Sequence, residues 1–164
     1  EVYEDELSKF ATVDLATSTK EQADYTVMAI CARTPSNNLL VMDLVRQRLQ
    51  APDIIPMIKD KVREHNLTYV GIEKVGFQLA LIQIARKEGL LIKELRADRD
   101  KINRALPLSA KMEGGQIFYR SGAMWYDDLQ REMLQFPEGE HDDIVDALAY
   151  AVLETDRKKS LRAY

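Results

Sequence analysis

The sequence contains a single cysteine, no long hydrophobic run and no apolar leader, and each absence narrows the class of protein. Cys31 cannot form a disulfide within the chain, and its apolar surroundings predict a small buried side chain in a reducing compartment. No apolar run approaches the roughly 20 residues that a membrane-spanning helix needs. The acidic start, residues 1–6, lacks the basic and apolar regions of a signal peptide. Because the first residue is Glu1 rather than methionine, we expect the chain to be a piece of a longer protein.

The chain also lacks an excess of basic charge, which argues against tight binding of nucleic acid by charge alone. Its net charge is −4, and the four acids within residues 1–6 account for all of it, so the remainder is neutral. Seven basic and four acidic residues between Lys93 and Arg120 leave a local surplus of +3. The composition, 46% hydrophobic and 30% charged, is ordinary for one domain with a real core. A local basic track is therefore compatible with this otherwise neutral domain.

Strand and helix patterns alternate over nearly the whole sequence. Strands are expected over residues 9–15, 25–33, 39–48, 67–73, 90–95 and 116–119. Helices are expected over residues 52–65, 76–88, 100–112, 125–136 and 142–156. Pro107 is expected to interrupt the third helix, and the polar segments 17–24 and 35–38 make turns between the first three strands. This order predicts an α/β fold with a central mixed sheet, antiparallel over its first three strands and then parallel, with helices on both faces.

Two acidic residues stand where predicted strands end. Asp14 closes the first strand and Glu73 closes the fourth, and in open α/β sheets sites gather at such strand ends. If the two strands are neighbours, the carboxylates stand side by side and raise each other's pKa unless a cation lies between them. Hard cations such as Mg²⁺ and Mn²⁺ prefer oxygen ligands of this kind. In isolation each acid fits an ordinary explanation about as well: a turn residue for Asp14, and an ion pair with Lys74 for Glu73.

The predicted last helix adds three more acids. Asp143 and Asp146 are three residues apart and share a face, and Asp142 and Asp146 are four apart. Acids in a first helical turn also gain from capping and from the helix dipole, which is the ordinary explanation for Asp142 and Asp143. Asp146 lies deeper, among apolar residues, where a carboxylate needs a partner. A cation shared with the strand-end acids would be such a partner.

These motifs, taken in order, resemble the ribonuclease H-like superfamily of metal-dependent nucleases, and within it the C-terminal nuclease domain of the large terminase subunit of tailed phages. The resembling segments are residues 13–16, 23–27, 71–73, 100–105, 114–117 and 136–149. The last of them, Phe-Pro followed by His-Asp-Asp-Ile-Val-Asp-Ala, is the most specific. The resemblance implies a ribonuclease H-like nuclease domain over residues 9–157, a linker stump or extension over residues 1–8, and a basic C-terminal tail over residues 158–164.

The resemblance also implies a reaction and the residues that perform it. The reaction is hydrolysis of phosphodiester bonds with two divalent ions, Mg²⁺ or Mn²⁺, by an endonuclease that cuts concatemeric viral double-stranded DNA during genome packaging. The implied catalytic and metal-binding acids are Asp14, which would bridge both ions, Glu73, Asp143 and Asp146, with Asp142 as a further ligand or a supporting residue. The candidate DNA contacts are Lys74, Lys101, Arg104, Lys111 and Arg120, each of which also fits an ordinary solvated surface charge.

The resemblance further implies partners. In a full-length terminase such a domain works with a motor ATPase domain, the portal and the small terminase subunit, in the cytoplasm of the infected bacterial host. No Gly-x-x-x-x-Gly-Lys-Ser/Thr loop occurs here, so the motor is not within this chain. Two other hypotheses stay open. An actin-like ATP-binding fold would use residues 14–20 as a phosphate loop, although that segment lacks glycine. A non-cleaving module that binds DNA or a partner is the second, and the intact acids argue against it.

Overall fold

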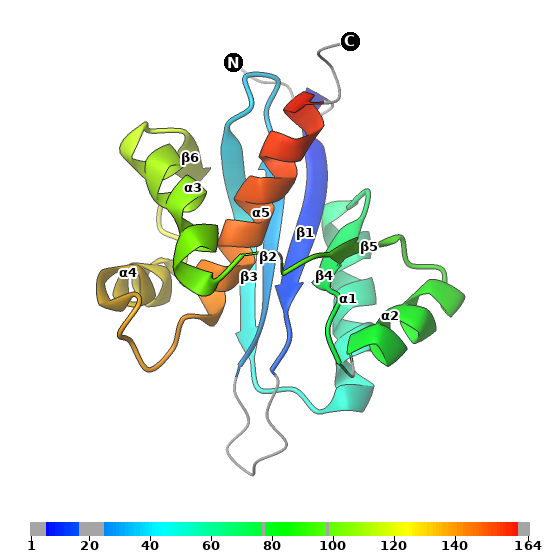
Figure 1. The fold of residues 1–164 in the computed structure, drawn as a ribbon. Helices are drawn as coiled ribbons and strands as arrows, with labels where there is room; N and C mark the ends of the chain where they lie inside the picture. Colours follow the sequence, from blue (N-terminus) through cyan, green and yellow to red (C-terminus); the bar gives the residue numbers. More distant parts are fainter. Residues whose placement is uncertain (1–5, 17–24, 77, 98, 161–164) are drawn as a thin grey trace.

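The computed structural model describes residues 6–16, 25–76, 78–97 and 99–160, which form one sheet with helices packed on it (Figure 1). The predicted turn at residues 17–24 lies outside the described residues, as do residues 1–5 and 161–164. The strands are β1 (Ser8–Asp14), β2 (Thr26–Arg33), β3 (Leu39–Gln47), β4 (Val70–Glu73), β5 (Ile92–Leu95) and β6 (Ile117–Tyr119). The helices are α1 (Ala51–His65), α2 (Gln78–Lys87), α3 (Lys101–Glu113), α4 (Tyr126–Gln135) and α5 (Asp143–Ser160).

The sheet has the mixed topology that the element order predicts. Its strand order is β5-β4-β1-β2-β3-β6. The pairs β1–β2 and β2–β3 are antiparallel, whereas β4 runs parallel to β1, β5 parallel to β4 and β6 parallel to β3. Val13 pairs with Ile72, so the next residues along both strands, Asp14 and Glu73, emerge at the same edge of the sheet. The neighbouring strands on which the predicted acidic site depends are therefore present.

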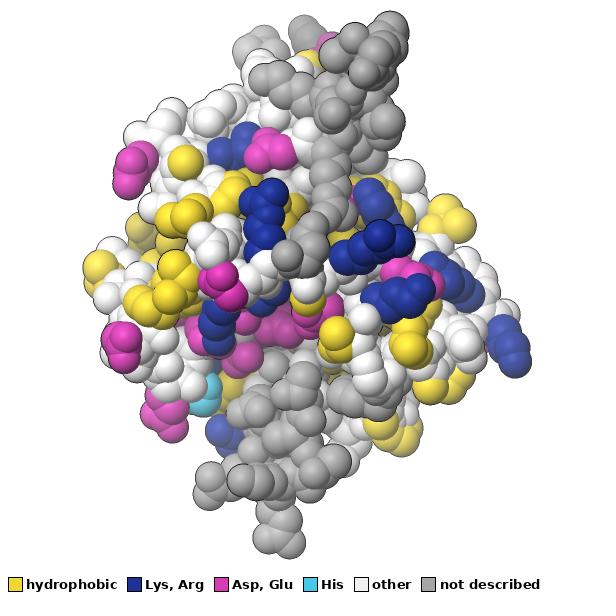
Figure 2. Space-filling model, viewed as in Figure 1, with side chains coloured by type: hydrophobic (Ala, Val, Ile, Leu, Met, Phe, Trp, Pro, Cys, Tyr) yellow, Lys and Arg dark blue, Asp and Glu magenta, His cyan; other side chains and the backbone are white. Residues whose placement is uncertain are grey.

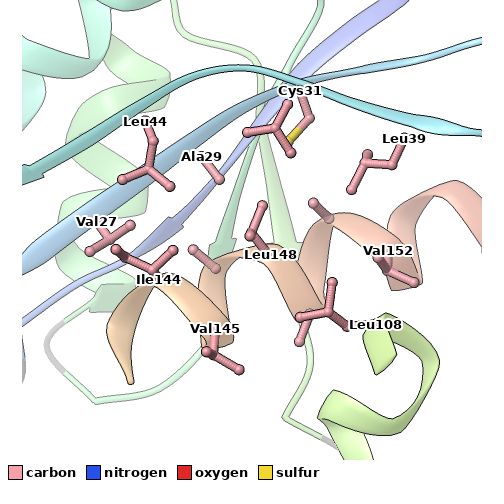
Figure 3. Packing of buried hydrophobic residues seen from close by; sticks show 14 of the residues in the cluster. Val27, Ala29, Cys31, Leu39, Leu44, Leu108, Ile144, Val145, Leu148 and Val152 are labelled. Atoms are coloured by element: carbon pink, nitrogen blue, oxygen red, sulfur yellow. The ribbon is translucent and has the colours of Figure 1, made fainter. Parts of the chain in front are cut away.

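One face of the sheet is covered by the last helix. Val27, Ala29 and Cys31 alternate along β2 toward this face, as the two-residue period of a strand requires. Figure 3 shows them packed against Ile144 and Leu148, which lie four residues apart on α5. Leu108 of α3 and Leu129 of α4 extend this core. The predicted burial of Cys31 is confirmed, since its side chain has no exposed surface.

The opposite face packs on the two earlier helices. Ala11, Val13, Met28 and Ile30 point to this face because they alternate with the residues of the first core. Their partners on α1 and α2 are Ile54, Ile55, Ile58, Leu81, Ile82 and Ala85. Two cores on opposite sides of one sheet leave β1 and β2 buried on both faces, which makes their register fixed and their ends well placed to carry a site.

The observed elements differ from the sequence prediction in several places, of which three matter most. Pro107 does not interrupt α3, which runs unbroken from Lys101 to Glu113 because the buried Ala105 and Leu108 hold it against the core. Strand β4 begins at Val70, three residues later than predicted. Helix α5 continues to Ser160, so residues 158–160 of the expected tail are helical. Within the described part of the chain, no helix is both long enough and apolar enough to cross a membrane.

Candidate active site

Asp14 and Glu73 lie together at the end of two parallel central strands. Both follow buried residues, Val13 and Ile72, and at this edge the sheet gives way to loops. Gly71 keeps β4 close to its other neighbour: a Cβ built there would lie 2.9 Å from a methyl group of Leu95 on β5. A larger residue would force the buried Leu95 side chain to shift. The sequence between residues 71 and 73 thus serves the placement of the second acid.

Helix α5 is fastened over β1 at the level of these acids. The Thr12 hydroxyl donates a 2.7 Å hydrogen bond to the carbonyl of Ala147, and both residues are buried. The first turn of α5 is capped by a side chain from another helix, because Glu132 Oε2 accepts the amide of Ile144 at 2.8 Å and approaches that of Val145 at 3.4 Å. A buried carboxylate at a helix N-terminus gains from the unpaired amides and from the helix dipole. This cap fixes where α5 begins.

The burial of Glu132 has an electrostatic cost that a neighbouring arginine reduces. Burial raises the pKa of Glu132, while its hydrogen bond from Ile144 and the charge of Arg46 oppose that rise. Arg46 Nε lies 3.5 Å from Glu132 Oε1, so α4 is tied to both β3 and α5. Asp143 and Asp146, in the first turn of α5, are thereby held above the strand ends.

The charges of three other acids act on Asp14. Burial raises the pKa of Asp14 to about 8, and the charges of Asp146, Asp143 and Glu73, in that order, add to the rise, which Arg104 opposes. Figure 2 shows acidic side chains gathered at the centre of the face seen in Figure 1, with basic side chains on either side. Asp14, Glu73, Asp143 and Asp146 thus influence one another's charge at this edge of the sheet.

Two basic residues of α3 contact the acids of α5. Arg104 Nη2 donates to Asp146 Oδ1 at 3.2 Å, and its side chain is only 11% exposed. Lys101 pairs with Asp142, and its Nζ lies 3.7 Å from Asp146 Oδ2. Asp142 also starts the helix, since its carbonyl accepts the amide of Asp146. The carboxylate of Asp142 is therefore engaged in an ion pair with Lys101.

Glu73 is held from the other side by a residue that the sequence analysis missed. The Tyr150 hydroxyl donates a 2.7 Å hydrogen bond to Glu73 Oε1. Burial, followed by this hydrogen bond, raises the pKa of the Tyr150 hydroxyl well above its usual range, so it remains a donor. The signal in the sequence is its spacing: Tyr150 lies four residues after Asp146 and so shares its helix face. Glu132 gives no such signal, because its capping role depends on how α4 packs against α5.

The four acids at the sheet edge are not the most tightly gathered group. Among the described residues, the one set of three His, Cys, Asp or Glu side chains whose ligand atoms all lie within 4.8 Å is Asp43, Glu64 and His65. Lys61 already occupies that group, with Nζ 3.0 Å from Asp43 Oδ2 and 2.9 Å from Glu64 Oε2. The acids at the sheet edge offer a different donor set, made of carboxylate oxygens alone. One of these acids is Asp14, whose ionised form is disfavoured by burial. That set fits hard divalent cations.

The predicted DNA contacts divide into three groups. Lys101 and Arg104 lie at the acids. Lys74 and Arg120 are exposed, and Lys74 Nζ pairs with Glu94 at 2.8 Å. Lys111 is 7% exposed, with its Nζ donating to the Asn37 carbonyl at 3.2 Å. A buried, paired ammonium is not presented to a phosphate, so the structure argues against the DNA contact predicted for Lys111.

A sheet in this order, with acids at the ends of β1 and β4 and on the last helix, defines a ribonuclease H-like domain of the nuclease class. The family model described as the terminase RNaseH-like domain matches residues 11–155, and the chain belongs to that family. The resemblance stated from the sequence is thereby confirmed, as is the predicted fold class. The search of curated proteins found no match.

Solved structures share the fold at low sequence identity. The large terminase nuclease of thermophilic phage G20c with bound magnesium has a TM-score of 0.70 and 19% identity, over 94% of this chain and 85% of that one. The nuclease domain of the large terminase of bacteriophage SPP1 with bound manganese has a TM-score of 0.60 and 11% identity, over 90% and 85%. RuvC of T. thermophilus in complex with a Holliday junction substrate has a TM-score of 0.55 and 12% identity, over 93% and 96%.

Proposed function

We propose that this domain is an endonuclease that hydrolyses phosphodiester bonds of double-stranded DNA, using divalent ions held by Asp14, Glu73, Asp143 and Asp146. The observation that carries the proposal is the state of Asp14: burial, and after it the charges of Asp146, Asp143 and Glu73, raise the pKa of this carboxyl to about 8. Such an arrangement is unfavourable for a stable fold and is compensated when cations bind. The terminase nuclease structures with bound magnesium and bound manganese support this assignment.

The ions and the protein side chains contribute different parts of the reaction. Two ions, Mg²⁺ or Mn²⁺, would supply activation of water and stabilisation of charge on the leaving 3′-oxygen. The chain supplies four carboxylates on rigid elements: two at strand ends fixed by the sheet, and two on a capped helix. Bound cations would favour the ionised form of Asp14, because their charge would oppose the repulsion from Asp146, Asp143 and Glu73.

Basic side chains around the acids would position the DNA backbone. Lys101 and Arg104 lie on one side of the acids, and Lys74 directly follows Glu73 on the other. Phosphate contacts of this kind fix the register of the duplex without reading its sequence. Arg120, exposed beyond β6, is a more distant candidate. Lys111 is not among these contacts, because its side chain is buried and its Nζ lies 3.3 Å from Asp156 Oδ1.

The family supports a proposal for the biological setting. We place the domain in a phage large terminase that cuts concatemeric viral DNA during packaging, in the cytoplasm of the infected bacterial host. A motor ATPase domain, the portal and the small terminase subunit would be its partners. The family match speaks against the actin-like ATP-binding alternative, whose supposed phosphate loop falls mostly in residues outside the described part of the chain.

Cleavage of plasmid DNA tests the proposal. Wild-type protein with Mg²⁺ or Mn²⁺ should nick and linearise a supercoiled plasmid, and EDTA should stop the reaction. Asp14→Asn should lower the rate by at least roughly 100-fold, the scale of a loss of about 3 kcal/mol in transition-state stabilisation. The matched control is Asp43→Asn, in the acidic group that Lys61 already neutralises, and it should cut at nearly the wild-type rate.

The possible outcomes separate the hypotheses. DNA binding without any cleavage, under every metal condition, would favour the non-cleaving module. Cleavage that survives Asp14→Asn would contradict the site assignment. Equal losses in Asp14→Asn and Asp43→Asn would show that activity follows stability rather than the acids at the sheet edge.

A further inference from the structure

Two tyrosine–glutamate hydrogen bonds connect the β4 segment to α5, and they are arranged as a crossed pair. The Tyr150 hydroxyl donates to Glu73 Oε1 at 2.7 Å, and the Tyr69 hydroxyl donates to Glu154 Oε2 at 3.2 Å. Tyr69 and Glu73 are four residues apart at β4, and Tyr150 and Glu154 are four residues apart on α5. The two bonds therefore have the same chemistry and join the same elements, but only one of them ends on an acid of the site.

Each tyrosine ring also carries a cation on its face. The Arg104 guanidinium carbon lies 4.7 Å from the centre of the Tyr150 ring, and Lys93 Nζ lies 5.5 Å from the centre of the Tyr69 ring. The two cations differ in which acid they contact. Lys93 pairs with Glu154, the same acid that Tyr69 holds. Arg104 instead reaches a different acid, with Nη2 3.2 Å from Asp146 Oδ1.

Tyr150 and Arg104 therefore form a bridge between two acids that come from different elements. Tyr150 is 3% exposed and holds one oxygen of Glu73. Arg104 rests on the Tyr150 ring and holds one oxygen of Asp146. The bridge uses Oε1 of Glu73 and Oδ1 of Asp146, and Lys101 Nζ approaches the other oxygen of Asp146 at 3.7 Å. A planar guanidinium suits this position, because it stacks on an aromatic face and donates from its edge at the same time.

We propose that Tyr150 and Arg104 are positioning residues that fix the separation and orientation of Glu73 and Asp146 for divalent ions. This role rests on the proposed function and adds to it the residues that orient the metal ligands. Residues that orient metal ligands typically change metal affinity by about 10–100-fold when they are replaced. The Tyr69–Glu154 bond, four residues away along both segments, ends on Glu154, which is not one of the four acids, and so serves as an internal control.

The test compares Tyr150→Phe with Tyr69→Phe. Both variants keep the ring and its packing and lose one hydroxyl that bonds a glutamate. Binding of Mn²⁺ is measured by calorimetry in the absence of DNA, and the Mn²⁺ concentration that gives half-maximal plasmid cleavage is measured in parallel. Tyr150→Phe should weaken Mn²⁺ binding and raise the half-saturating concentration by roughly tenfold, with most of the maximal rate restored at high Mn²⁺. Tyr69→Phe should leave both values unchanged, whatever it does to the melting temperature.

Arg104→Lys gives a second, independent variant. It keeps the positive charge near Asp146 but loses the planar group that lies on Tyr150 while donating to Asp146. Its Mn²⁺ affinity should fall as in Tyr150→Phe, although its charge toward DNA is unchanged. This variant also keeps the inference testable if Tyr150→Phe folds poorly, which circular dichroism would reveal.

The outcomes distinguish this inference from the function on which it rests. Wild-type Mn²⁺ affinity in both Tyr150→Phe and Arg104→Lys would overturn the positioning role and leave the nuclease proposal intact. Equal losses of Mn²⁺ affinity in Tyr150→Phe and Tyr69→Phe would mean that both hydrogen bonds only hold α5 in place. That result would also overturn the positioning role. A wild-type protein that neither binds Mn²⁺ nor cleaves DNA would overturn the proposed function, and the inference with it.

Discussion

Two acidic groups in this domain look alike in sequence composition and differ in how their charge is neutralised. In the group of Asp43, Glu64 and His65, a lysine of the protein sits among the acids. Burial of Asp43 is outweighed by its hydrogen bonds from Lys61 and from the Leu44 amide, and the net effect is a lowered pKa. At the sheet edge burial dominates, neighbouring carboxylates add to it, and the pKa of Asp14 rises to about 8.

The comparison shows that close gathering of ligand atoms is a poor guide to a metal site. The Asp43 group is the tighter one, with ligand atoms within 4.8 Å of one another, yet Lys61 occupies the place that an ion would need. The acids at the sheet edge spread more widely and are only partly compensated, by Arg104 and Lys101. An excess of negative charge that the protein itself does not neutralise is the better indication.

The largest effects should separate two adjacent acids of α5. Asp143→Ala should lower plasmid cleavage by at least roughly 100-fold, on the scale of several kcal/mol of lost transition-state stabilisation, since its charge acts directly on Asp14. Asp142→Ala should lower it by less than about tenfold, because Asp142 is paired with Lys101. Cleavage rates at saturating Mn²⁺ provide the measurement. The reverse order of effects would transfer the ligand role to Asp142.

The stability of the metal-free protein should depend on pH in opposite ways at the two groups. The folded-state pKa of Asp14 is raised above its unfolded value near 4, so the folded state binds the extra proton between about pH 4 and pH 8. Stability from this group therefore falls as pH rises through that window. The pKa of Asp43 is lowered, so its contribution is present above about pH 4 and is lost as pH falls below that value.

Thermal melts in EDTA, from pH 5 to pH 9, measure this difference. Asp14→Asn should be more stable than wild type at pH 8 by about 1–3 kcal/mol, and the two should converge toward pH 5. Asp43→Asn should instead be less stable at neutral pH, because Lys61 loses a charged partner. An Asp14→Asn variant that is destabilised at pH 8 would mean that Asp14 is compensated within the protein, and the contrast between the groups would disappear.

Much of the fold and part of the site could be predicted from the sequence. The two-residue period of β2, the Pro52 helix start and the terminal positions of Asp14 and Glu73 are local signals, and they gave the element order and the strand-end acids. Packing between elements carries no local signal. The Tyr150–Glu73 bond depends on α5 lying over β4, and the Glu132 cap depends on α4 meeting α5.

The burial and pairing of individual charged side chains were harder to predict, because they also depend on packing between elements. Lys111 belongs to a run with net basic charge, but its position on the inner face of α3 buries it against the turn before β3 and against α5. Pro107 is a helix breaker by local rules, but the tertiary contacts of Ala105 and Leu108 keep α3 intact. The group around Lys61 was missed, because β3 and α1 are brought together only by the sheet.

Lys101 and Lys111 of α3 are both paired with acids, but Lys111 is buried and Lys101 is partly exposed. Lys111→Ala should lower the free energy of unfolding by about 1–3 kcal/mol, since it leaves the Asn37 carbonyl and Asp156 without their partner. It should not change DNA affinity. Lys101→Ala should weaken binding of a short duplex by a few-fold in EDTA, with little loss of stability, because its ammonium is exposed beside the acids. Duplex binding by fluorescence anisotropy and melts on the same samples provide the measurements.

The smallest effect should come from metal at the Asp43 group. Mn²⁺ should raise the melting temperature of wild type and of Asp43→Asn by the same increment, because Lys61 already neutralises that group. In Lys61→Ala the increment should grow slightly, since three ligand groups within 4.8 Å then lack their cation. Asp14→Asn should lose most of the increment. A wild-type increment that disappears in Asp43→Asn and survives in Asp14→Asn would move the metal site to the tighter group, because only the acids that bind the ion can transmit its binding energy to the fold.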